Sequence, residues 1–199
     1  MNPRVLIALV LVAVFALGAA VLAAQGGSDS AGETASSKFE GALMPKGVKA
    51  PAFDLKDEYG KPISMSSFRG KPVVVSFLYT HCQNTCPAQA QTIRGALDDL
   101  GHDVPAIAIS VDPPNDTDDS AQAFLSKQHA LGRLHFVLGT RAQLSPLWKR
   151  FGIQPQTKNQ EHLARVTLVD KRGYQRIGYP GAQATPERLA HDLKLLERE

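Results

Sequence analysis

The chain has 199 residues, 43% of them hydrophobic, and a formal net charge of +3. Its basic residues are scattered, without a basic stripe that contains interleaved aromatic residues, which argues against a nucleic-acid-binding protein. The length suits one ordinary domain with an additional segment at one end.

The N-terminal segment is the most apolar part of the sequence. Residues 5–24 contain no charged or strongly polar side chain, and about 20 apolar residues at ~1.5 Å each span a hydrocarbon core of about 30 Å. We therefore expect residues 1–24 to form a transmembrane anchor. A cleaved signal peptide is the alternative, because small residues around Ala20 to Ala24 suit a peptidase.

Charge on either side of this segment predicts its orientation. Arg4 precedes the apolar run, and no charge follows it until Asp29. The positive-inside rule then places the N-terminus in the cytoplasm and the rest of the chain on the extracytoplasmic side, in a periplasm or at the cell exterior. Residues 25–46, rich in Gly, Ser and Ala, predict a flexible linker. The folded domain is expected over residues 47–199.

Within the domain, strand and helix patterns alternate. The strongest strand signal is the β-branched run at 72–78 (PVVVSFL), which is typical of a strand buried on both faces. Turn and capping signals delimit the other elements. The patterns predict strands at 53–55, 63–65, 72–78, 104–111, 135–138, 163–169 and 175–179, and helices at 87–100, 118–130, 142–151 and 186–199.

This order indicates the class of fold. Strand–helix alternation implies crossover connections and a mixed, mostly parallel sheet covered by helices on both faces. The last two strands flank the turn at 170–173 and predict an antiparallel hairpin. The order fits an α/β thioredoxin-like fold with additional elements between the second and third core strands.

Cys82 and Cys86 are the only cysteines of the chain, and three residues separate them. A bridge across so short a loop restricts the unfolded chain little, so the pair favours redox or metal chemistry over a structural staple. Both lie where the strand at 72–78 passes into the helix at 87–100, and a helix N-terminus favours the thiolate, which is both nucleophile and metal ligand. A redox-inert disulfide is the alternative.

The type of ligand narrows the choice of metal. Two thiolates suit Cu(I), and an additional imidazole would allow the site to hold Cu(II) as well. Structural zinc requires four protein ligands, and this sequence offers three.

Two motifs resemble those of a known family. Residues 79–87 (YTHCQNTCP) resemble the YT-x-C-x-x-x-C-P signature of the Sco family, also called SenC/PrrC. Residues 110–117 (SVDPPNDT) resemble its SVDP-x-x-DT stretch, and the likeness extends over about 47–199. The resemblance implies a copper chaperone that delivers copper to the binuclear copper centre of cytochrome c oxidase. Its partner would be the copper-bearing oxidase subunit or another copper chaperone.

The resemblance also implies a third copper ligand. The histidine of the family that lies just before a late core strand corresponds to His162. Family members often have an aspartate before this histidine, whereas this chain has Glu161. The implied metal site is therefore Cys82, Cys86 and His162, with copper as Cu(I) or Cu(II).

Three further polar residues are expected near the cysteines. His81 is expected to have a surface or supporting role, because neighbouring side chains of an extended chain point apart. Asp112 and Asp116 follow the strand at 104–111, on the same sheet edge as the cysteines. They are expected to cap the following helix and its turn, or else to tune the copper site or contact the recipient protein.

The cysteines allow other functions. An extracytoplasmic thiol–disulfide reductase would use Cys82 as the nucleophile and Cys86 as the resolving thiol, and His162 distinguishes it from the chaperone because a reductase needs no imidazole there. A thiol peroxidase would need a polar constellation around one cysteine that the sequence does not reveal. An exported interaction domain with an incidental disulfide is the remaining alternative.

Overall fold

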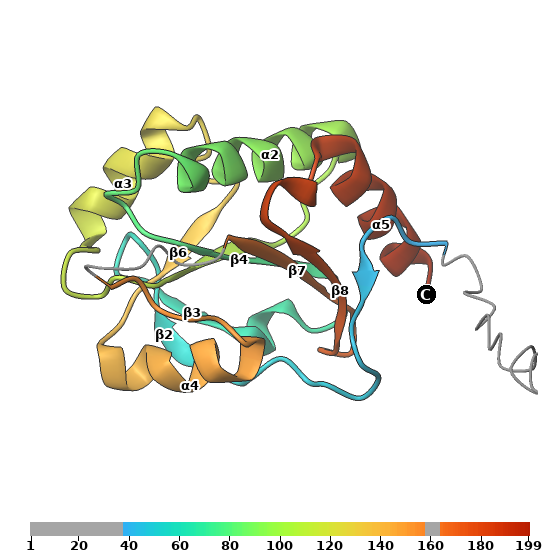
Figure 1. The fold of residues 1–199 in the computed structure, drawn as a ribbon, viewed down its shortest axis with the longest axis horizontal. Coiled ribbons are helices and arrows are strands. Elements are labelled where there is room, and N and C mark those ends of the chain that lie inside the picture. The colour runs from blue at the N-terminus through green and yellow to red at the C-terminus, as the bar shows by residue number, and fades with distance from the viewer. Residues whose placement is uncertain (1–37, 158–163) are drawn as a thin grey trace, which may run out of the picture. The chain divides into compact units, whose positions relative to one another are not determined.

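A six-stranded mixed sheet forms the centre of the domain (Figure 1). This computed structural model describes residues 38–157 and 164–199. The strand order is β1-β8-β7-β4-β5-β6, and a separate two-stranded sheet pairs β2 with β3. The strands are β1 (Ala42–Leu43), β2 (Asp54–Lys56), β3 (Pro62–Ser64), β4 (Val73–Leu78), β5 (Ala106–Ser110), β6 (His135–Val137), β7 (Arg165–Val169) and β8 (Gln175–Pro180).

The sheet is less parallel than the sequence indicates. β4, β5 and β6 are parallel neighbours, joined by crossovers that contain helices. β7 pairs with β4, and β8 with β7 and β1, all antiparallel. The expectation of a mostly parallel sheet is therefore wrong, because the closing hairpin and the N-terminal strand add three antiparallel pairings to two parallel ones.

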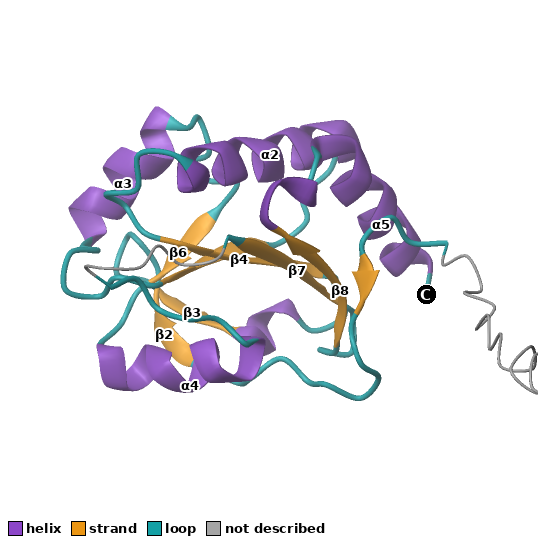
Figure 2. Ribbon diagram, in the orientation of Figure 1, coloured by secondary structure: helices purple, strands orange, loops and turns teal. Residues whose placement is uncertain are grey.

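Helices cover both faces of the sheet (Figure 2). On one face lie α2 (Thr85–Leu100), α3 (Asp118–Lys127) and α5 (Pro186–Arg198), and on the other lie α4 (Arg141–Phe151) and the β2–β3 hairpin. Successive residues of β4 alternate between the two cores: Val74 and Leu78 face α2, while Val75 and Phe77 face α4. The run at 72–78 is thus a central strand buried on both faces, as its sequence predicts.

The helix ends follow local sequence signals. α2 ends at Leu100 and is capped by Gly101, whose φ of +73° is a left-handed conformation that glycine adopts without strain. α4 begins with a capping box between Thr140 and Gln143. Thr185 caps α5, and Pro186 is its first residue.

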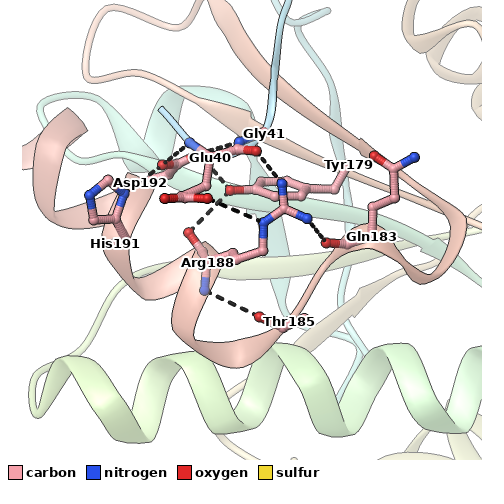
Figure 3. Close-up of polar contacts among 8 residues, drawn as sticks. All are labelled: Glu40, Gly41, Tyr179, Gln183, Thr185, Arg188, His191 and Asp192. Carbon is pink, nitrogen blue, oxygen red and sulfur yellow. Dashed lines mark hydrogen bonds and ion pairs between the residues drawn. The ribbon is translucent and has the colours of Figure 1, made fainter. Parts of the chain in front are cut away.

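Part of the expected linker belongs to the sheet. Ala42 and Leu43 pair with β8, and the preceding backbone is held by Asp192 of α5, whose carboxylate accepts the N–H groups of Glu40 (2.8 Å) and Gly41 (3.0 Å). Figure 3 shows this cluster, in which the Tyr179 hydroxyl also donates to Asp192 at 2.5 Å. A two-residue strand held by long-range contacts has no periodicity that a sequence could show.

The expected anchor at 1–24 lies outside the described residues, as does most of the linker. Within residues 38–157 and 164–199, we find no helix that is both long enough and apolar enough to cross a membrane.

Candidate metal and thiol site

The two cysteines lie together at the N-terminus of α2. Both lie at the junction of strand and helix, as the sequence indicates, with Cys82 in the loop after β4. α2 starts at Thr85, two residues before the expected start at 87, so Cys86 is in the first turn of the helix. Cys82 is 7% exposed and Cys86 is completely buried, and no disulfide joins the two in the described part of the chain. The backbone N–H of Cys86 donates to the Sγ of Cys82 at 3.2 Å, and the hydroxyl of Thr85 lies 3.6 Å from the same sulfur.

These surroundings make the two thiols unequal. Burial raises the pKa of Cys82, but hydrogen bonds from the Cys86 side chain and backbone, together with Asn84 and Thr85, outweigh burial and lower its pKa below the ordinary value. Burial raises the pKa of Cys86 far above the ordinary value, and the neighbouring Cys82 raises it further. Of the two thiols, Cys82 therefore loses its proton more readily, and Cys86 holds its proton more tightly.

Access to the pair is through Cys82. A pocket of about 430 Å³ lies between the cysteine loop and α3, and Cys82 lines it while Cys86 does not. From α3, Phe124 and Lys127 are among the residues that line it. An incoming thiol or ligand on this side meets Cys82 first. The lining residues are Thr80, His81, Cys82, Gln83, Pro87, Ser120, Ala123, Phe124, Lys127 and Gln128.

The third expected ligand, His162, lies outside the described residues, as does Glu161. The copper site of Cys82, Cys86 and His162 therefore stays a prediction as a set. His81 is exposed, and its Nδ1 lies 3.0 Å from the hydroxyl of Thr80, which fits the expected surface or supporting role.

Asp116 does not cap the following helix. The N-cap of α3 is Thr117, whose hydroxyl accepts the N–H of Ser120 at 3.2 Å. The Asp116 carboxylate instead contacts Thr80, in the cysteine loop, and Ser110. For Asp116 the capping expectation is wrong, because the turn at 112–116 directs this side chain back toward the sheet edge.

A second polar cluster carries no sequence signal. Ligand atoms of Asp57, Glu58 and His135 lie within 4.8 Å of one another. The fully buried Glu58 accepts the N–H of Phe136 at 2.9 Å and contacts Nδ1 of His135 at 3.0 Å. Its carboxylate is thus occupied in tying the β2–β3 turn to β6. In the sequence, Glu58 belongs to the stretch 58–61 (EYGK) between two expected strands, whose pattern indicates only a turn.

The chain is similar to known proteins of two kinds, Sco proteins and peroxiredoxin Q. The SCO1/SenC family model matches residues 43–197. Peroxiredoxin Q of Gentiana triflora is 38% identical over 159 residues, which cover 78% of this chain and 68% of the relative.

Solved structures share the fold. ScoI of Bradyrhizobium japonicum with copper bound is 29% identical, with a TM-score of 0.60 over 74% of this chain and 99% of that chain. BsSco, a member of the Sco family of cytochrome c oxidase assembly proteins in which a disulfide switch was identified, is 23% identical, with a TM-score of 0.68 over 79% and 98% of the two chains. The domain therefore has the mixed α/β, thioredoxin-like fold of the Sco proteins. Since the family model covers most of its length, the chain belongs to the SCO1/SenC family.

Proposed function

We propose that this protein is a copper metallochaperone that binds copper through Cys82, Cys86 and His162. It delivers the metal to the binuclear copper centre of cytochrome c oxidase during assembly, directly to the copper-bearing subunit or through another copper chaperone. Residues 1–24 anchor it in the membrane, and the domain works on the extracytoplasmic side. The family of the chain and the copper-bound ScoI structure support this function.

The observation that carries the proposal is the convergence of the two sulfurs at the start of α2. The N–H of Cys86 donates to the Cys82 sulfur at 3.2 Å, and the two thiol side chains hydrogen-bond each other, so both sulfurs are close enough to bind one small ion. Two sulfur donors are the soft ligands that Cu(I) prefers. Because the pKa of Cys86 is raised, copper binding must displace its proton, which makes the affinity increase with pH.

Delivery follows from the different exposure of the two cysteines. A thiolate of the recipient approaches through the pocket beside Cys82 and binds the copper as the Cys82 sulfur dissociates. Cys86 and His162 are then replaced in turn, and the thiols freed on this protein take up protons. Copper remains Cu(I) throughout, so the exchange needs no oxidant or reductant.

A thiol–disulfide reductase is the second candidate, favoured by the unequal pKa values of the two thiols. The Cys82 thiolate attacks one sulfur of a partner's disulfide and forms a mixed disulfide, releasing the partner's other thiolate. Cys86 then loses its proton and attacks the Cys82 sulfur. The partner leaves as a dithiol, this protein carries the Cys82–Cys86 disulfide, and an external dithiol must reduce it again.

An anaerobic Cu(I) titration of the reduced full-length chain against a competing chelator tests the first proposal. We expect tight binding of copper by the wild type, a loss of affinity of about tenfold or more in His162→Ala, and no tight binding in Cys82→Ser or Cys86→Ser. His129→Asn is the control, because His129 is exposed and its φ of +53° is one that asparagine adopts readily.

Two results would contradict the chaperone: no tight copper binding by the wild type, or an affinity that does not depend on His162. Either result leaves the reductase as the function to test. The reductase predicts stoichiometric release of thiols from a disulfide-bonded peptide by the reduced wild type, and none by Cys82→Ser.

A further inference from the structure

We infer that Asp116 is a positioning residue for the cysteine loop. Its carboxylate holds Thr80, two residues before Cys82, and so fixes the segment that presents the Cys82 sulfur. Asp116 acts through Thr80 and does not itself contact the metal or the thiol. The inference rests on the proposed thiol and copper chemistry of the Cys82–Cys86 pair.

The Asp116 carboxylate is enclosed and its oxygens have partners. Asp116 is 7% exposed. Its Oδ1 accepts both the backbone N–H and the hydroxyl of Thr80, each at 2.8 Å, and its Oδ2 accepts the hydroxyl of Ser110 at 2.6 Å. Burying a carboxylate costs free energy unless hydrogen-bond donors surround it. The three donors that converge on Asp116 therefore compensate for its burial.

These contacts join two neighbouring strand ends. Ser110 is the last residue of β5 and pairs with Leu78, the last residue of β4. Thr80 follows β4 by two positions, at the start of the cysteine loop. Asp116 therefore fastens the beginning of the cysteine loop to the end of the adjacent parallel strand.

From Thr80 the constraint continues to Cys82. The backbone N–H of Cys82 donates to the carbonyl of Tyr79 at 3.4 Å, closing a tight turn around Thr80 and His81. The Thr80 hydroxyl also lies 3.0 Å from Nδ1 of His81. At the other end, the Sγ of Cys82 accepts the Cys86 N–H. The loop is thus tied at both ends, and release of Thr80 would let the Cys82 sulfur move away from its donors.

The test compares four variants of the full-length chain. Asp116→Asn removes the charge at similar volume, Thr80→Val removes the hydroxyl and keeps the shape, and Thr80→Ser keeps the hydroxyl. Asp170→Asn is the matched control, because Asp170 is also buried (6% exposed) and accepts the N–H groups of Arg172 and Tyr174 at 2.9 Å, in the β7–β8 turn. The readouts are the equilibrium constant between the Cys82–Cys86 dithiol and disulfide in a glutathione buffer, the Cu(I) affinity, and the urea midpoint.

We expect Asp116→Asn to shift the thiol equilibrium about tenfold toward the disulfide, which is about 30 mV for this two-electron couple. The equilibrium shifts toward the disulfide because the hydrogen-bond donors that stabilise reduced Cys82 lose their alignment. Cu(I) affinity should fall by about tenfold, and Thr80→Val should act in the same direction by a smaller factor. Thr80→Ser should remain within about twofold of the wild type, and Asp170→Asn should lower only the urea midpoint.

The inference is wrong if Asp116→Asn and Thr80→Val both leave the thiol equilibrium within about twofold of the wild type. Should Asp116→Asn fail to fold, the contrast between Thr80→Val and Thr80→Ser decides alone. A wild type without tight copper binding would contradict the proposed chaperone, but the thiol equilibrium would still report on Asp116.

Discussion

The backbone N–H of Cys86 points at the sulfur of Cys82, 3.2 Å away. This hydrogen bond belongs to the first turn of α2, where N–H groups have no partner within the helix. It stabilises a negative charge on Cys82, whereas Cys86 lies behind it in the core. The two cysteine side chains at the start of α2 therefore differ in pKa, which is lowered for Cys82 and raised for Cys86.

The first prediction concerns the alkylation of these two thiols. The thiolate is the reactive form, so the rate of alkylation rises as the pH passes the pKa of each thiol. Because the pKa of Cys82 is lowered and that of Cys86 is raised, iodoacetamide should modify Cys82 first. The pH at which the Cys82 rate is half-maximal should lie below the ordinary cysteine pKa of about 8.5. Mass spectrometry of the reduced wild type across a pH series measures both rates. Faster modification of Cys86, or equal rates for the two, would contradict the assignment.

The second prediction concerns the buried carboxylate of Asp192. Asp192→Ala leaves the N–H groups of Glu40 and Gly41 without their acceptor, while the Tyr179 hydroxyl keeps only the Arg188 carbonyl, 3.1 Å away. We expect the free energy of unfolding to fall by about 2–4 kcal/mol, since each buried unsatisfied group costs about 1–3 kcal/mol. Urea denaturation measures this loss. The exposed Asp99 provides the control, and Asp99→Ala should change stability by less than about 0.5 kcal/mol; a similar loss in both variants would refute the role of the cluster.

The third prediction concerns Gly41, which has no room for a side chain. A Cβ there would lie 2.7 Å from the ring of Tyr179 and closer still to Ile177. Gly41→Ala should cost about 1–3 kcal/mol of unfolding free energy through this clash. Because it displaces the same segment that Asp192 holds, Gly41→Ala combined with Asp192→Ala should lose less than the sum of the two single losses. Additive losses in urea denaturation would show that the two residues act independently.

The fourth prediction concerns pH and the pair of His135 and Glu58. The hydrogen bond to the buried Glu58 raises the pKa of His135 above its ordinary value. Its stabilising contribution is therefore fully present below the unfolded pKa of about 6.5 and is lost as the pH rises through the higher folded pKa. The stability difference between the wild type and His135→Gln should be larger at about pH 5.5 than at about pH 9. Thermal unfolding at both values measures this difference, and a difference independent of pH would rule out the pair as its source.

Much of the site region could be predicted because its signals are local. A β-branched, aromatic run indicates a central strand, and Pro87 directly after Cys86 marks the start of a helix. Together they place both cysteines at a strand–helix junction, where the structure has them. The motifs at 79–87 and 110–117 identify the family without reference to geometry, and the family model confirms it.

Contacts between distant parts of the chain could not be predicted in this way. Asp116 lies 36 positions from Thr80, and a turn followed by a helix suggests a capping aspartate rather than a partner for another loop. Ala42 and Leu43 belong to the sheet only because Asp192, about 150 positions away, binds the backbone beside them. Such pairings depend on which segments of the chain meet after folding. Segments as short as these have no sequence periodicity from which the pairings could be predicted.

The sequence by itself therefore determined the family, the thioredoxin-like alternation of strands and helices, and the placement of Cys82 and Cys86 at a helix start, because propensity, patterning and motif spacing are local properties. Only the tertiary structure decided which surroundings lower the pKa of Cys82 and raise that of Cys86, that Asp116 contacts Thr80 of the cysteine loop, and that β1, β7 and β8 make half of the sheet antiparallel. The difference between the two thiols depends on burial and on the folded geometry of the helix start, and the other two features depend on hydrogen bonds between segments that are distant in sequence. All of these exist only once the chain has folded.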